Sequence, residues 1–128
     1  SPIKDSRFDT SIRGCGLVLD HCKSLKVENC EIARNGWHGL LMAECHNGKI
    51  ENCLIEGNDG CGFMGEYLHD GSSKIQIKHN TIQYNNDYGI QTFAMKEPDV
   101  KDNLYRWNGK EERQECISPE KKLQLEQL

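Results

Sequence analysis

The chain has 128 residues, 36% of them apolar, and a formal net charge of −4 at pH 7. This length suits one domain with a modest core. The acidic balance and the mean hydropathy of −0.74 argue against nucleic-acid binding and against a membrane span, because there is neither a basic footprint nor a long apolar run.

Seven cysteines are present, an odd number without any CxxC pair. This pattern argues against a disulfide framework and against a zinc ribbon. We expect mostly reduced, partly buried thiols, which favours an intracellular, cytoplasmic location. The opening SPIKDSRFD shows no secretory signal, but a fragment would have lost one, so secretion is the alternative.

Residues 1–16 match the later pattern only loosely and show no cap signature. They are predicted to form an irregular first coil. An uncovered end of a repeat array exposes strand edges and core side chains. This end is therefore expected to pair with another segment, or with a second copy in a homodimer.

A repeat of about 23 residues occupies positions 17–109. Clear copies begin at Ser24, Gly48 and Ile75. Equivalent residues are separated by 23, 27 and 23 positions in two apolar columns, Val27/Ile50/Ile77/Val100 and Ile32/Ile55/Ile82/Tyr105. The glycine column steps by 23, 23 and 27, through Gly16, Gly39, Gly62 and Gly89. A four-residue insertion is therefore predicted between Gly62 and Ile77.

Each copy holds three short apolar or alternating runs, separated by Asn-Gly or Asp-Gly turns, and no helical stretch. A leucine-rich repeat would carry a helix or helical turn instead. The pattern predicts an all-β, right-handed parallel β-helix of about four coils, stacked about 4.8 Å apart. The other inward columns are expected to be Leu17/Leu40/Phe63/Ile90, Leu19/Met42/Gly65/Thr92 and Cys22/Cys45/Leu68/Met95.

One polar column is expected at a turn of each coil. There Asn80 and Asn103 can stack their amides into a hydrogen-bonded ladder, and Cys30 and Cys53 occupy the same position in earlier coils. The glycine column marks either a positive φ or a place where no Cβ fits.

Residues 110–128 form a C-terminal tail in which SPEKKLQLEQL predicts a short capping helix. Ser118 would be its N-cap and Pro119 its first residue. Its Leu123, Leu125 and Leu128 would cover the last coil or bind elsewhere.

Two groups of residues have types and spacings that could support chemistry. Glu28 and Glu51 would lie about 5 Å apart on adjacent coils, as in a retaining glycosidase, but Lys26 and Lys49 beside them favour a solvated charge ladder. The second group, Cys15, His38 and Cys61, could offer three ligands to zinc, yet a linear column suits a tetrahedral site poorly. We therefore predict no catalytic, cofactor-binding or metal-binding residue.

An apolar stripe is predicted on the outside. Alternation sends Val18, Leu41 and Met64 outward, and Trp37 and Tyr67 could extend them into a patch. Such a patch is typical of a protein interface or of self-association. The alternative is that the chain's own tail, or a further domain, covers the stripe.

The repeat resembles the pectate-lyase-type parallel β-helix family, most clearly in IKHNTIQYNNDYGIQTF. That family includes polysaccharide lyases, glycosidases and epimerases, and also intracellular adaptors such as F-box-only and SHC-binding proteins. The cysteine-rich coils and NLYRWNGKEE look more like the adaptors. The resemblance implies a non-enzymatic protein-interaction domain in an adaptor or scaffold, with a carbohydrate-binding or polysaccharide-cleaving module as the alternative.

Overall fold

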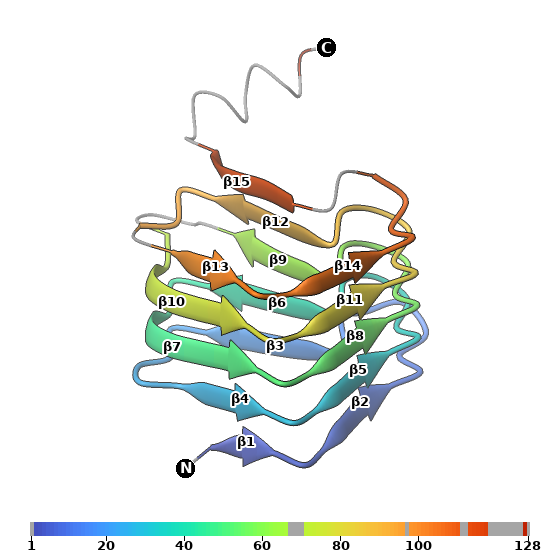
Figure 1. Cartoon of the computed structure of the whole chain (residues 1–128), viewed down its shortest axis with the longest axis horizontal. Coiled ribbons are helices and arrows are strands. Elements are labelled where there is room, and N and C mark those ends of the chain that lie inside the picture. Colours follow the sequence, from blue (N-terminus) through green and yellow to red (C-terminus); the bar gives the residue numbers. More distant parts are fainter. Residues whose placement is uncertain (1, 67–70, 97, 111–112, 118–126, 128) are drawn as a thin grey trace.

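The computed structural model describes residues 2–66, 71–96, 98–110, 113–117 and 127, and this part of the chain consists of strands and turns without a helix. Fifteen strands form three parallel sheets of five (Figure 1). Sheet A contains β1 (Ile3–Lys4), β4 (Lys26–Glu28), β7 (His46–Glu51), β10 (Ser73–Lys78) and β13 (Asp99–Lys101). Sheet B contains β2 (Arg7–Asp9), β5 (Glu31–Ala33), β8 (Leu54–Glu56), β11 (Thr81–Gln83) and β14 (Leu104–Arg106). Sheet C contains β3 (Leu17–Asp20), β6 (Leu40–Ala43), β9 (Phe63–Glu66), β12 (Ile90–Phe93) and β15 (Arg113–Ile117).

Each coil contributes one strand to every sheet, and each strand pairs in parallel with its counterpart in the next coil (Figure 1). The predicted β-helix of about four turns is confirmed. So is its register, because Val27 faces Ile50, Ile50 faces Ile77 and Ile77 faces Val100. The second apolar column, through Ile32, Ile55, Ile82 and Tyr105, pairs in the same way in sheet B.

The two ends of the chain extend this pattern. In the segment expected to be irregular, β1 and β2 already pair in register with β4 and β5, and Ile3 and Phe8 pack against the core. At the other end β15 adds a fifth strand to sheet C. The predicted capping helix, with Leu123, Leu125 and Leu128, lies outside the described residues.

The insertion lies between Glu66, which pairs with Ala43, and Ser73, which pairs with His46. This register corrects one predicted core column. Ser72 takes the position next to Cys45 that was expected for Leu68, and its Oγ accepts a hydrogen bond from the Cys45 backbone N–H at 3.0 Å. The error arose because the four inserted residues lie before the position that pairs with Cys45. The predicted column assumed that they lie after this position.

The core consists of the inward-facing residues of all three sheets. Val27, Ile50 and Ile77 of sheet A and Ile32, Ile55 and Ile82 of sheet B are fully buried. In sheet C, Leu40, Phe63 and Ile90 are fully buried in the same way. Alternate residues of a strand point to opposite faces, so each short strand needs only one or two apolar residues to build this core.

The glycine column is explained by lack of space. A Cβ on Gly39 would lie 2.7 Å from the carbonyl oxygen of Gly62, and a Cβ on Gly62 would lie 2.8 Å from that of Gly89. None of these glycines has a positive φ. Of the two explanations left open by the sequence, the correct one is therefore that no Cβ fits at these positions.

Asparagine ladders satisfy the bent backbone. The predicted one is confirmed, since Asn80 Nδ2 donates to Asn103 Oδ1 at 3.0 Å and the Cys53 backbone N–H donates to Asn80 Oδ1 at 2.9 Å. A longer ladder follows sheet B, where each Nδ2 donates to the Oδ1 of the next coil at 2.9–3.0 Å, through Asn35, Asn58, Asn85 and Asn108. These amides replace strand pairing where the chain turns.

Candidate functional site

The predicted apolar stripe on sheet C is not an open patch. Val18 is 57% exposed and Leu41 half-buried, but Met64 is only 7% exposed. Met64 packs against Phe93 and Cys61 in a small apolar cluster on sheet C, with Leu41 at its margin. Alternation predicted the outward direction of Met64 correctly, but its expected exposure is wrong because Phe93 of the next coil packs against it.

Of the two aromatic residues expected to extend the stripe, the structure describes Trp37 alone. Trp37 is 52% exposed, and its ring stacks on His38 with 4.4 Å between centroids. Tyr67 lies outside the described residues. Trp37 is therefore an exposed aromatic residue whose ring contacts His38.

The column of Cys15, His38 and Cys61 lines a turn. The His38 ring accepts a hydrogen bond at Nδ1 from the Cys61 backbone N–H at 2.9 Å. Burial lowers the pKa of His38 and raises the pKa of Cys61 to about 12. Both groups are thus held neutral, and no cluster of three His, Cys, Asp or Glu residues suited to a metal occurs in the described part of the chain.

The carboxylates Glu28 and Glu51 are neighbours in adjacent strands, as predicted. Lys49 Nζ lies 2.9 Å from Glu51 Oε2, and this hydrogen bond lowers the pKa of Glu51. A glycosidase acid needs the opposite, a pKa raised by an apolar pocket. The pair behaves as the charge ladder that the flanking lysines indicated.

The outer face of sheet B is charged in its first coils. Arg7 contacts Asp9 and Glu31 at 3.1 and 3.0 Å, and Arg34 contacts the same two carboxylates at 3.2 and 3.6 Å. Each side chain of this network has an opposite charge beside it. We call these four residues the ion-pair network.

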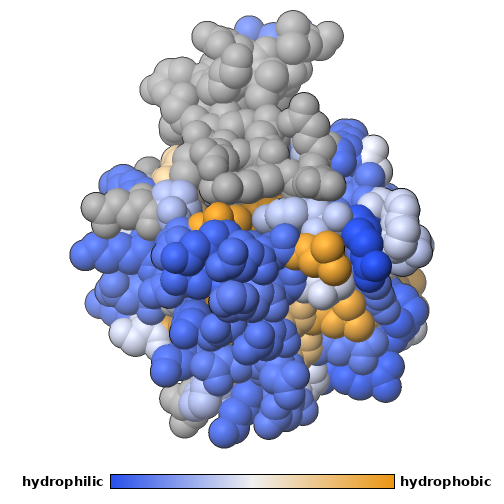
Figure 2. Space-filling model, in the orientation of Figure 1, coloured by the Kyte–Doolittle hydropathy of each residue, from blue (hydrophilic) through white to orange (hydrophobic). Residues whose placement is uncertain are grey.

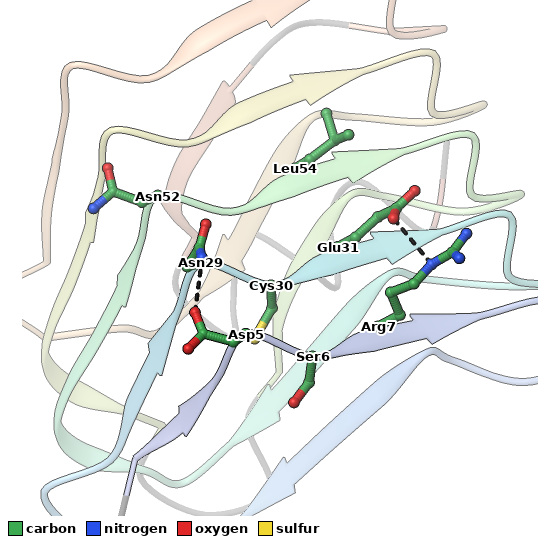
Figure 3. Close-up of a pocket in the computed structure, with 8 residues that line it drawn as sticks. All are labelled: Asp5, Ser6, Arg7, Asn29, Cys30, Glu31, Asn52 and Leu54. Carbon is green, nitrogen blue, oxygen red and sulfur yellow. Dashed lines mark hydrogen bonds and ion pairs between the residues drawn. The ribbon is translucent and has the colours of Figure 1, made fainter.

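A cavity of about 390 Å³ opens where sheets A and B meet, beside the ion-pair network (Figure 3). Asp5 and Asn29 form one wall, joined by a hydrogen bond of 2.7 Å from Asn29 Nδ2 to Asp5 Oδ1. Arg7 and Glu31 form another and bind each other. The polar groups at this bend are thus largely engaged with one another, which leaves few of them for a ligand.

The last two coils of sheet B carry an exposed apolar group instead. Tyr84, Leu104 and Trp107 are 54%, 50% and 63% exposed. Tyr84 and Trp107 stack with 4.9 Å between ring centroids, and the Arg106 guanidinium lies 4.9 Å from the Trp107 centroid. We call Tyr84, Leu104, Arg106 and Trp107 the sheet B platform.

Hydrogen bonds hold the platform in place. Arg106 donates twice to Gln83 Oε1 in the preceding coil, from Nη2 at 2.8 Å and from Nε at 3.2 Å. Figure 2 shows a few apolar groups among hydrophilic surface on the sheet B side of this view, and mostly hydrophilic surface over sheet A. The sequence contained a signal for the platform, because the outward column loses its charges along the solenoid: it runs through Arg7, Glu31, Leu54, Thr81 and Leu104.

The comparisons with known proteins agree with this architecture. A family model, the right handed beta helix region, matches residues 3–112. The chain therefore belongs to the right-handed parallel β-helix family. No curated protein sequence matches it.

A solved structure with the same fold is the A-module of mannuronan C-5 epimerase AlgE4 from Azotobacter vinelandii, with a TM-score of 0.59 and 19% sequence identity. The match covers 80% of this chain and 34% of that one, so the present chain spans about a third of the module. At this identity the likeness concerns the fold alone. No helix in the described part of the chain is long and apolar enough to cross a membrane.

Proposed function

We propose that this β-helix is a non-enzymatic interaction domain of an intracellular adaptor or scaffold, and that the sheet B platform binds its protein partner. The observation that carries the proposal is the grouping of Tyr84, Leu104 and Trp107, all at least half exposed, on two adjacent coils. Tryptophan, tyrosine and arginine dominate the centres of protein interfaces. The platform replaces the predicted sheet C stripe as the candidate site.

The shape and surroundings of the platform support a protein partner. A parallel sheet offers a broad, rigid face, so little ordering entropy is lost on binding. The ring of Trp107 is already held by Tyr84 and Arg106. The ion-pair network on the earlier coils of the same sheet would supply the polar rim that surrounds an interface core.

The rival is a carbohydrate-binding or carbohydrate-cleaving module. It is favoured by the name of the solved structure, a mannuronan C-5 epimerase, but this likeness is one of fold. In the carboxylate pair considered for cleavage, the hydrogen bond with Lys49 lowers the pKa of Glu51, the opposite of what a catalytic acid needs. Protein binding is therefore the better-supported function.

The test begins with a partner identified by proximity labelling and purified for direct titration. Trp107→Ala should weaken binding by about thirtyfold, since an interface anchor contributes roughly 2 kcal/mol or more. Its melting temperature should stay close to that of the wild type, because Trp107 lies on the surface.

Two controls locate the site. Val18→Ala changes an exposed apolar residue on sheet C and should leave the affinity unchanged. Leu41→Glu places a charge in the predicted stripe. Loss of binding in Leu41→Glu with full binding in Trp107→Ala would move the site back to sheet C.

Self-association and sugar binding need separate measurements. Sedimentation velocity of the isolated chain tests for a homodimer through the first coil or the stripe. Titration with acidic polysaccharides, with and without calcium, tests the rival function. Saturable sugar binding together with no platform-dependent protein partner would overturn the proposal.

A further inference from the structure

Sheet A concentrates positive charge on an acidic chain. Eight of its eleven lysines lie in sheet A or in the turns that lead into it, although the net charge is −4. They are Lys4, Lys23, Lys26, Lys49, Lys74, Lys78, Lys96 and Lys101. The lysines are therefore not spread over the surface as a solubilising coat would be.

Three of these lysines line one cavity. Lys26, Lys49 and Lys74 come from three successive coils and enclose a volume of about 520 Å³, together with the neutral side chains of Asn47 and Gln76. A second cavity, of about 290 Å³, is lined by residues that precede those of the first on two of the same coils, His21, Lys23, Glu44 and His46. We call the two cavities together the basic groove.

The carboxylate in the wall of the groove is already engaged. Glu44 is buried, and its Oε2 lies 2.6 Å from His21 Nε2, while His21 Nδ1 lies 2.5 Å from Asp20 Oδ1. The second imidazole of the groove, His46, has its Nδ1 2.6 Å from Ser73 Oγ. The Glu44 carboxylate is thus hydrogen-bonded to the His21 imidazole.

The lysines themselves differ in pairing. Lys49 binds Glu51 at 2.9 Å. Lys23, Lys26 and Lys74 have no carboxylate within ion-pair distance among the residues that the structure describes. Lys26 also pairs in register with Lys49, so two like charges lie on neighbouring strands, and strands in a sheet are spaced about 4.8 Å apart. Like charges in this position destabilise a sheet, and an anion between them would remove the repulsion.

The positive charge is bounded on two sides. Along the solenoid, the column of Lys26 and Lys49 continues through Gln76 to Asp99. Across the strands, Glu28 and Glu51 follow the two lysines on the same outer face. A long polyanion that continued in either direction would meet carboxylates, whereas a compact one could stay beside Lys26, Lys49 and Lys74. The cavity volume lies within the range of small-molecule sites.

We propose that the basic groove binds a compact polyanion, a small molecule with at least two phosphate or carboxylate groups, through Lys26, Lys49 and Lys74. Asn47 and Gln76 would donate hydrogen bonds to the same anionic oxygens. This site lies on a different sheet from the platform and does not depend on the proposed protein binding.

The test is calorimetric titration of the full chain with tripolyphosphate and with citrate, which distinguishes phosphate from carboxylate groups. We expect saturable 1:1 binding of at least one of them, weakened by salt. Lys26→Gln and Lys74→Gln should each lower the affinity about tenfold, the loss expected for one charge-assisted hydrogen bond. Both lysines are exposed, so both variants should fold.

Lys101→Gln is the matched control, since it removes an exposed lysine from the same sheet outside the groove. It should bind as the wild type does, and so should Trp107→Ala. An equal loss in Lys101→Gln would mean unspecific attraction and would overturn the proposal. The proposal would also fail if neither tripolyphosphate nor citrate binds, or if an acidic polysaccharide binds and these small polyanions do not.

Discussion

Sheets A and B share one backbone pattern and one interior, yet their outer faces are different surfaces. On sheet B the charges of the ion-pair network neutralise one another, and the last coils carry exposed aromatic residues. On sheet A most lysines of the groove have no carboxylate within ion-pair distance among the described residues. Stacking requires the inward columns to repeat, because each coil buries its apolar residues against the next. The outward columns are free to change from coil to coil, so binding specificity resides in them.

The largest effect is expected where the two sheets are alike. Ile50 of sheet A and Ile55 of sheet B are both fully buried in the middle coil. Ile50→Ala and Ile55→Ala should each lower the free energy of unfolding by about 2–5 kcal/mol, measured by chemical denaturation. A loss below about 1 kcal/mol in one of them would show that the two inner faces are not equivalent.

The two asparagine ladders should differ in strength. Asn58 is buried, and its Oδ1 accepts two hydrogen bonds from Asn35, from the backbone N–H at 3.1 Å and from Nδ2 at 2.9 Å. Asn58→Ala leaves these donors unpaired and should cost about 2–3 kcal/mol in denaturation experiments. Asn103→Ala, at the half-buried end of the ladder between sheets A and B, should cost less. Equal losses would mean that burial does not set the strength of a ladder.

Alkaline pH should weaken the packing around the buried thiols, Cys45 and Cys53 in the shared core and Cys61 in the sheet C cluster. Burial raises the pKa of Cys45 and Cys53 to about 11 and that of Cys61 to about 12, from 9.0 in an exposed thiol. The native state therefore keeps protons that the unfolded state loses. The stability from these thiols is complete below pH 9 and declines as the pH rises towards 11 and 12.

Denaturation curves recorded across this range should show the decline, and Cys53→Ala should reduce it. The same thiols should resist labelling in the native state near neutral pH. Rapid labelling of Cys45 or Cys53 in the folded chain would contradict their burial.

The smallest effect separates the outer faces most directly. Arg34→Gln removes a member of the ion-pair network and should cost up to about 1 kcal/mol. Lys26→Gln removes a lysine that repels its neighbour, so its melting temperature should equal or slightly exceed that of the wild type. Added salt should reduce both differences, because it screens exposed charges. A clear loss of stability in Lys26→Gln would show that this lysine has a stabilising partner.

Some features of the site escaped prediction for identifiable reasons. The exposure of Met64 was misjudged because alternation gives the direction of a side chain and not what packs over it. The platform was overlooked because Tyr84 and Trp107 follow their strands, where both adopt a positive φ and leave the alternating pattern. The groove joins lysines from three coils, and their pairing depends on where neighbouring carboxylates point.

The spacing of 23 and 27 residues, by itself, determined the parallel pairing, the register of the inward isoleucine columns and the polar ladder at Asn80 and Asn103. It could do so because identical positions must stack when coils of one repeat bury a common core. Only the tertiary structure decided that Ser72 rather than Leu68 continues the Cys45 column, that Met64 is covered, and that aromatic residues and lysines gather on separate faces. Those features depend on contacts between side chains of different coils, and a periodic pattern carries no information about such contacts beyond the positions that repeat.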